Sequence, residues 1–147
     1  RRSYLESKLT RGRRIAFDYG DARIGVAICD PDGILATPLP FLDSKHPKVM
    51  QHIADLFAEY EPIAIYLGLP KHLSGSDGEA VAKVESFASR LAEISSIPVR
   101  YVDERLSTVD AQRRLREAGK SAKDSKLLID SMAAVAILEG GLARENK

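Results

Sequence analysis

The stretch RRIAFDYGDARIGVAICDPDG, residues 13–33, decides the fold of this chain. It contains two apolar runs of strand length, Arg13–Tyr19 and Arg23–Cys29, joined by a loop of three residues. The Asp-Pro-Asp-Gly sequence that ends the stretch is a strong turn signal, and we predict that Ile34–Phe41 forms a third strand after it. The stretch therefore predicts an antiparallel meander.

The segments that follow predict two more strands and four helices. Ile63–Leu69 is a continuous apolar run, which is typical of a parallel strand covered on both faces. Pro38 and Pro40 indicate that the third strand lies at a sheet edge or ends early. The other predicted elements are the strand Ile97–Asp103 and the helices His46–Tyr60, Asp77–Ser95, Ser107–Ala118 and about Ser121–Arg144. This order predicts an α/β fold with a mixed sheet and helices on its faces.

Length and composition predict one ordinary globular domain. The chain has 147 residues, of which 44% are hydrophobic and 29% charged. We expect residues 1–12 to form a flexible basic arm and residues 13–144 to form the domain. No apolar run is long enough to span a bilayer and no signal peptide opens the chain, so we expect a cytoplasmic location without a membrane partner. The single cysteine, Cys29, excludes an internal disulfide and is interpreted as a small core residue.

Positive charge is concentrated in two segments although the net charge is only +1. Residues 1–14 contain six basic residues against one acidic residue, and residues 100–126 contain eight against five. This asymmetry favours a basic surface that faces a polyanion such as nucleic acid. A solvated tail and a charged helix face explain the same charges equally well.

Three acidic residues occupy positions that burial and propensity do not favour. Asp18 lies inside the first strand, Glu104 directly follows the last strand, and Asp130 interrupts the otherwise apolar run LLIDSMAAVAIL. A buried carboxylate without a partner is costly, so each requires a cation, a metal ion or a proton. If the first and last strands lie side by side under the last helix, the three carboxylates converge. Such oxygen ligands suit Mg²⁺ or Mn²⁺, which support phosphodiester cleavage.

Each of these acids also has a simpler interpretation as a member of an ordinary ion pair or as a surface residue. The simpler pairings are Asp18 with Arg23, Glu104 with Arg105, and Asp130 with Lys126. From the residues alone, the three acids are therefore a candidate site, and both interpretations stay open.

Two further segments could contact phosphates. The stretch GLPKHLSGSDG, residues 68–78, follows a buried strand and precedes a helix, which is where open sheets bind ligands. Residues 105–123 combine a natural N-cap, Ser107, with a basic helix face. A flexible connection and a solvated helix face are the simpler interpretations of the two segments.

The three histidines lack metal-ligand spacing, and we interpret them as facing solvent.

Four motifs, in this order and spacing, resemble the YqgF-type proteins, which are RNase H-like proteins of bacteria associated with Holliday junction resolution or pre-16S rRNA processing. The motifs are FDYGDARIGVAICDPDG, YLGLPKHLSGSDG, VDERLSTVDAQRRL and KLLIDSMAAVAIL. The resemblance covers about residues 13–142. It implies a ribonuclease H-like mixed sheet, with three antiparallel strands followed by two parallel strands, flanked by helices.

The resemblance also implies the site. The family's active-site acids fall on Asp18, Glu104 and Asp130, the same residues that burial singles out, and they would hold Mg²⁺ or Mn²⁺. The segments implied to lie near the site or to contact nucleic acid contribute Gly68, Pro70, Lys71, Arg105, Thr108, Arg113 and Arg114. One departure is Asp21-Ala22, where the family commonly has small or basic residues. The extra carboxylate of Asp21 could add a metal contact or repel a phosphate.

The function that we predict is a metal-dependent endonuclease acting on structured nucleic acid. Within this class, the resemblance favours processing of the 5′ end of pre-16S rRNA in ribosome biogenesis, with Holliday junction resolution in DNA recombination as the alternative. A four-way junction would favour a homodimer with two sites, whereas trimming one RNA end would not require one. A third hypothesis is a non-catalytic nucleic-acid-binding module. A nucleotide-binding fold of the actin and sugar-kinase type is disfavoured, since it normally needs two such domains.

Overall fold

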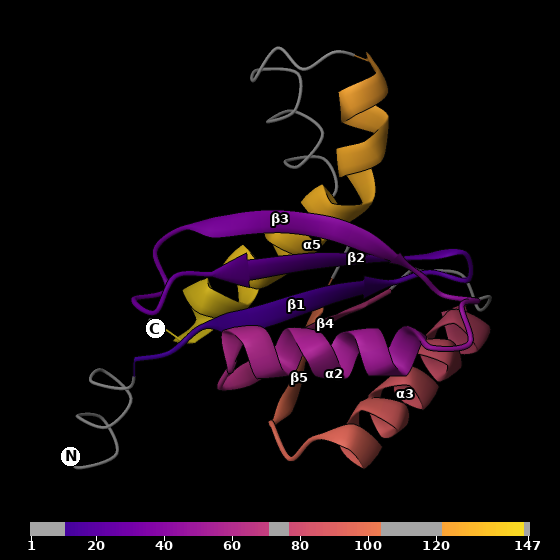
Figure 1. Ribbon diagram of the computed structural model, residues 1–147, viewed down its shortest axis with the longest axis horizontal. Helices are drawn as coiled ribbons and strands as arrows, with labels where there is room; N and C mark the ends of the chain where they lie inside the picture. The colour runs from indigo at the N-terminus through magenta and orange to yellow at the C-terminus, as the bar shows by residue number, and fades with distance from the viewer. Residues whose placement is uncertain (1–10, 71–76, 104–121, 146–147) are drawn as a thin grey trace.

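Five strands form one mixed sheet in the computed structural model of the chain, in the order β3-β2-β1-β4-β5 (Figure 1). The structure describes residues 11–70, 77–103 and 122–145, and for residues 77 and 122–130 it describes the backbone alone. The strands are β1 (Arg14–Tyr19), β2 (Arg23–Cys29), β3 (Ala36–Asp43), β4 (Ala64–Leu69) and β5 (Val99–Asp103). The described helices are α2 (Val49–Tyr60), α3 (Asp77–Ile94) and α5 (Ala122–Glu145). None of these described helices is long and apolar enough to cross a membrane.

The pairing of the strands confirms the predicted sheet. β1 pairs with β2 and β2 with β3 in antiparallel orientation, whereas β1 pairs with β4 and β4 with β5 in parallel orientation. The condition under which the three acids would converge, adjacent first and last strands, is not met, because β4 separates β1 from β5. One edge of β1 is occupied by β2 and the other by β4, so β5 pairs with the remaining edge of β4.

The third strand begins two residues later than predicted because the preceding turn extends further. The carboxylate of Asp30 accepts hydrogen bonds from the backbone N–H groups of Ile34 (2.7 Å) and Leu35 (2.8 Å), which holds both residues in the turn. The Leu35 N–H is the largest influence that lowers the pKa of Asp30. β3 lies at a sheet edge, as its two prolines predict, and it is not shortened.

The first described helix also begins later than predicted, at Val49 instead of His46. The ring nitrogen Nδ1 of His46 accepts the N–H of Lys48 at 3.0 Å, and this turn replaces the first predicted helical turn. Within the helix, Val49, Ile53 and Phe57 are buried on one face, as the apolar spacing predicts.

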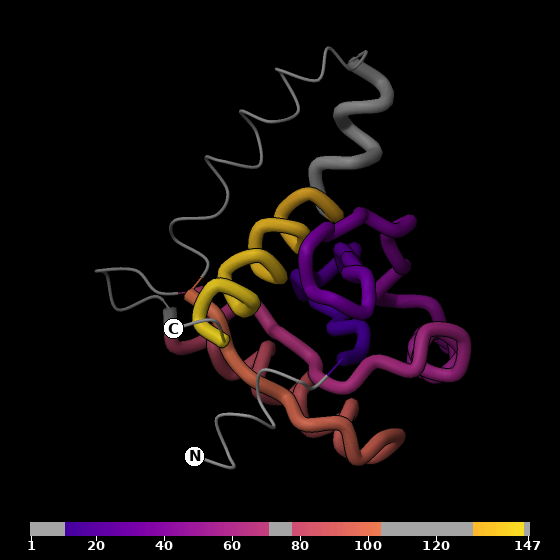
Figure 2. The backbone as a smooth tube through the Cα atoms, turned by 90° about the vertical axis from the view of Figure 1, so that its left-hand side faces the viewer, coloured from indigo at the N-terminus to yellow at the C-terminus, as the bar shows by residue number. Residues whose placement is uncertain are grey.

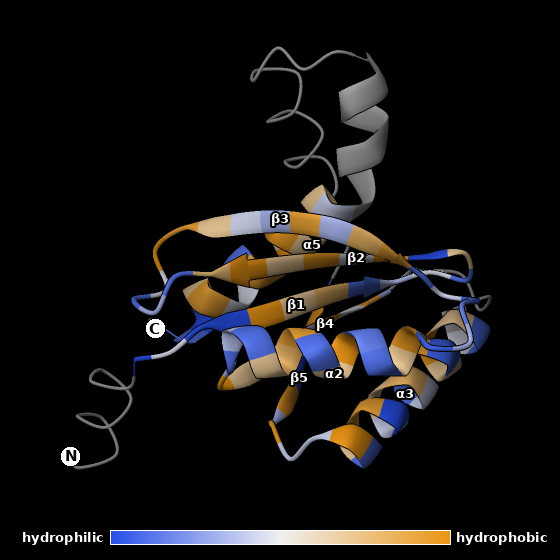
Figure 3. Ribbon diagram, viewed as in Figure 1, coloured by the Kyte–Doolittle hydropathy of each residue, from blue (hydrophilic) through white to orange (hydrophobic). Residues whose placement is uncertain are grey.

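Two hydrophobic clusters lie on opposite faces of the sheet. One contains Phe17 of β1 and residues of α2 and α3, with the Phe17 ring edge-on to those of Phe57 (6.2 Å) and Phe87 (5.7 Å). The other contains Ala16 of β1 and residues of α5. Figure 2 shows α5 and α2 on opposite sides of the sheet, and Figure 3 shows apolar residues along the middle of β1 and β2. Because side chains alternate along a strand, Asp18 belongs to the α5 face, like Ala16.

A buried polar network attaches the end of α5 to the start of β1. The Arg14 guanidinium donates to the Glu145 carboxylate at 2.7 Å and to the Gly12 carbonyl at 2.7 Å. The Tyr66 hydroxyl donates to the other carboxylate oxygen of Glu145. The helix comes this close because Gly141 lies against the Tyr66 ring, where a Cβ atom would approach to 2.6 Å.

Candidate active site

Asp18 lies near the end of the central strand of the sheet, half-buried, opposite Gly25 of β2. The three parallel strands end together at this edge, because Leu69 of β4 pairs with Asp103 of β5 and the β1–β4 register places Tyr19 level with Leu69. The carboxyl ends of parallel strands are where open sheets bind ligands. Asp18 is thus placed by the fold at the edge where chemistry is expected.

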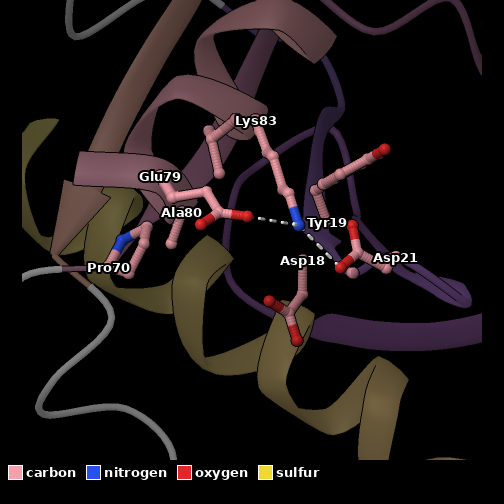
Figure 4. A pocket seen from close by; sticks show the side chains of 9 residues that line it. Asp18, Tyr19, Asp21, Pro70, Glu79, Ala80 and Lys83 are labelled. Atoms are coloured by element: carbon pink, nitrogen blue, oxygen red, sulfur yellow. Dashed lines mark hydrogen bonds and ion pairs between the residues drawn. The ribbon is translucent and has the colours of Figure 1, made fainter. Parts of the chain in front are cut away.

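An open cavity of about 370 Å³ surrounds this end of β1 (Figure 4). Its lining combines the β1–β2 loop, the end of β4 and the first turns of α3. The lining residues are Asp18, Tyr19, Gly20, Asp21, Pro70, Glu79, Ala80, Lys83 and Val84. The Tyr19 ring stacks on Phe87 at 4.8 Å, which connects the floor of the cavity to the hydrophobic core.

Lys83 of α3 reaches into the mouth of the cavity, where its ammonium group lies between two carboxylates (Figure 4). The Nζ atom is 2.9 Å from the Asp21 carboxylate and 3.6 Å from that of Glu79. The hydrogen bond to Asp21 is the main cause that raises the pKa of Lys83. The carboxylate of Asp21 is therefore engaged by a lysine.

The position of α5 over this edge is fixed by Ser131. The register of β2 against β3 shifts between Ile24 and Val26, which disrupts the hydrogen-bond ladder locally. The Ser131 hydroxyl bonds to the backbone of both strands at this point: it accepts the Val26 N–H at 3.4 Å and donates to the Leu39 carbonyl at 2.5 Å. Ser131 is buried, and it anchors the helix next to Gly25, the residue that pairs with Asp18.

The structure gives less detail for the other two predicted acids, Asp130 and Glu104. Asp130 lies in α5 directly before Ser131, and the structure describes its backbone alone. Glu104 lies outside the described residues and follows Asp103, the last residue of β5. Within the part of the chain that the structure describes, no three His, Cys, Asp or Glu residues are grouped so as to hold a metal ion.

The predicted nucleic-acid contacts are divided in the same way. Gly68 lies in β4 and Pro70 lines the cavity. The remaining predicted contacts, Lys71, Arg105, Thr108, Arg113 and Arg114, lie outside the described residues. His46 and His52 are exposed, as predicted, and the third histidine, His72, also lies outside the described part.

Sequence reasoning missed Lys83 and Glu79 as lining residues of the cavity. Both occupy the polar face of a helix, which ordinarily indicates contact with solvent. The signal that could have found them is their place in the first turns after the loop that follows β4, because such turns lie at the carboxyl edge of the sheet.

This sheet, with helices on both faces and a carboxylate at the end of its central strand, defines the class of RNase H-like resolvase folds. RuvC of T. thermophilus, solved in complex with a Holliday junction substrate, matches with a TM-score of 0.59 and 14% identity over 90% of this chain and 95% of that one. The Fowlpox virus resolvase, solved with Holliday junction DNA, matches with a TM-score of 0.55 and 11% identity over 92% and 99% of the two chains.

The family follows from the sequence. The family model RuvX, described as "Holliday junction resolvase", matches residues 12–144, and this chain belongs to that family. A Streptomyces coelicolor protein named "Putative pre-16S rRNA nuclease" is 49% identical over 140 residues, which are 94% of this chain and 84% of the relative. A Mycolicibacterium smegmatis protein of the same name is 49% identical over 140 residues, 90% of this chain and 81% of the relative.

Proposed function

We propose that this chain is an endonuclease that processes the 5′ end of pre-16S rRNA during ribosome biogenesis, in the cytoplasm. The observation that carries the proposal is Asp18, which lies on the α5 face of an RNase H-like sheet and lines a polar cavity at the carboxyl edge of that sheet. The names of the relatives at 49% identity favour pre-16S rRNA as the substrate. We propose residues 13–144 as the nuclease domain and residues 1–12 as a basic arm.

The donor set fits a divalent metal ion. Asp18 offers carboxylate oxygens, which Mg²⁺ and Mn²⁺ prefer, and the buried Ser131 attaches the helix that carries Asp130 to β2 and β3, next to the strand of Asp18. We propose that Asp18, Glu104 and Asp130 hold the metal. When bound, such an ion activates water and neutralises charge on the departing oxygen.

The chain itself positions the substrate. Gly20 forms the tight turn beside Asp18, where a Cβ atom would come within 2.8 Å of the Arg23 carbonyl oxygen, and Pro70 lines the cavity after the end of β4. We propose that the nucleic-acid backbone runs along this edge, where it contacts Gly68 and Pro70 and continues to Lys71, Arg105, Thr108, Arg113 and Arg114. Backbone N–H groups and basic side chains are the groups that bind phosphates.

A Holliday junction is the second candidate substrate, because the description of the family model names that activity and two proteins of the same fold were solved with junctions. Resolution of a four-way junction requires two symmetric cuts. With that substrate we would expect a homodimer, in which each subunit contributes one site.

A cleavage assay separates these functions. Wild-type protein is incubated with a labelled fragment that spans the 5′ end of pre-16S rRNA, or with a labelled four-way DNA junction, in Mg²⁺, in Mn²⁺ or in EDTA. We expect cleavage of the RNA at a defined position that EDTA abolishes, because the carboxylates need the metal to bind the substrate phosphate. Preferential cutting of the junction would support the second candidate, and binding of either substrate without cleavage would support a non-catalytic module.

A further inference from the structure

The described residues that line the cavity around Asp18 carry a net negative charge, which opposes the binding of a phosphate. Among the described residues that line it, three are acidic (Asp18, Asp21 and Glu79) and one is basic, Lys83. A nucleic-acid backbone that approaches Asp18 therefore meets one cation among these residues. Its ammonium group carries three N–H donors, of which one is directed to Asp21 at 2.9 Å and another faces Glu79 at 3.6 Å.

The partner that occupies Lys83 is itself easy to displace. The side chain of Asp21 is 66% exposed and that of Lys83 is 42% exposed, so the ion pair lies in contact with solvent. Exposed ion pairs contribute little to stability, and both side chains can rotate without disturbing the core. Asp21 lies in the β1–β2 loop, three residues from Asp18, so its carboxylate lies at the mouth of the same cavity.

We propose that Lys83 is a phosphate-binding residue of the site and that Asp21 is its built-in competitor, whose carboxylate takes the place of a substrate phosphate in the free protein. The inference rests on the proposed nuclease function, because it takes this cavity as the substrate site. A phosphate that enters displaces Asp21 from the ammonium group. Asp21 thus weakens the binding of substrate through Lys83. Only a substrate with enough other contacts to the protein displaces Asp21, so the competition makes binding selective.

A double-mutant cycle tests this coupling. Affinity for a fluorescent fragment of pre-16S rRNA is measured by anisotropy in EDTA, so that the result does not depend on cleavage. We expect Asp21→Asn to bind about fivefold more tightly and Lys83→Met about threefold more weakly than wild type, because each variant changes the interaction with a single phosphate. In the Lys83→Met background, Asp21→Asn should change affinity by less than about twofold, because without the lysine ammonium group the Asp21 carboxylate no longer competes with a substrate phosphate.

Salt dependence gives an independent readout. Lys83→Met should flatten the slope of log affinity against log salt by up to about one unit, and Asp21→Asn should steepen it, because a phosphate contact releases counterions. The matched controls are Lys45→Met and Asp55→Asn, exposed residues outside the cavity. They make the same charge changes and should leave affinity within about twofold of wild type.

Two results would overturn the proposal. One is an Asp21→Asn increase in affinity that persists in full without Lys83, since the carboxylate would then repel the phosphate directly. The other is a result in which Asp21→Asn and Lys83→Met each bind the RNA with the same affinity as the control variants. Loss of metal-dependent cleavage by Asp18→Asn is measured separately, so failure of the nuclease function and failure of this coupling are distinguishable. The side chains substituted in this cycle and in its controls are exposed, and unchanged melting temperatures would confirm that the variants fold.

Discussion

Asp18→Asn is expected to lower the rate of metal-dependent cleavage at least about a hundredfold. The substitution keeps the shape of the side chain but removes its negative charge, so the proposed metal site loses its central carboxylate. The measurement is single-turnover cleavage of the labelled pre-16S rRNA fragment at saturating Mg²⁺ or Mn²⁺. Because Asp18 is half-buried at the end of a strand, the melting temperature is recorded for the same preparation.

The matched control for this prediction is Asp32→Asn. Asp32 lies in the turn after β2, where its exposed carboxylate pairs with Arg11 at 2.8 Å, and it does not line the cavity. The control should cleave within about twofold of wild type, since an exposed pair contributes little. If Asp18→Asn cleaved as fast as Asp32→Asn, Asp18 could not be a metal ligand and the proposed site would be wrong.

Glu145→Ala is expected to lower the free energy of unfolding by about 3 kcal/mol, because it leaves the Arg14 guanidinium charged, buried and without its carboxylate. The side chains are only 8% (Arg14) and 20% (Glu145) exposed, so water replaces little of the lost interaction. The Tyr66 hydroxyl loses its acceptor in the same variant. Urea denaturation followed by circular dichroism gives the change.

The neighbouring residue supplies the control for this second prediction. Arg144→Ala removes an exposed side chain that donates to the Tyr101 carbonyl at 3.1 Å, and it should cost less than about 1 kcal/mol. Adding Arg14→Met to Glu145→Ala should restore part of the stability, because the unpaired buried charge is then removed. A double variant that is less stable than Glu145→Ala alone would show that the isolated charge is not the cause.

Much of the fold could be predicted because local patterns encode it. The alternation around Phe17, the turn after Cys29 and the apolar run of β4 each specify an element with its own residues. The order of the parallel strands is different, because it depends on which strand edges are paired in the whole sheet and not on the residues of β5 alone. No periodicity within β5 records that β2 and β4 flank β1, so the pattern alone does not show whether the first and last strands are adjacent.

The site is predictable for residues that contradict their local surroundings. Asp18 interrupts an apolar strand, and that conflict marks it in the sequence. Lys83 does not stand out from its neighbours in the sequence, because a lysine on the polar face of a helix is ordinary. Only the arrangement of α3 against β1 brings it to the cavity. Ser131 is a visible polar exception in an apolar helix, but its partner, the bulge between β2 and β3, cannot be foreseen from the helix itself.

The buried thiol of Cys29 gives the chain an intrinsic reporter of its own opening. Cys29 is the single cysteine, is 1% exposed, and its Sγ accepts the N–H of Arg14 at 3.1 Å across the β1–β2 pair. Burial raises the pKa of the thiol, so little of it is the reactive thiolate at neutral pH. A thiol reagent must therefore wait until the face of the sheet under α5 opens, because the Cys29 side chain is packed in the cluster with residues of that helix. The labelling rate under native conditions measures how often this face, which also carries Asp18, becomes accessible.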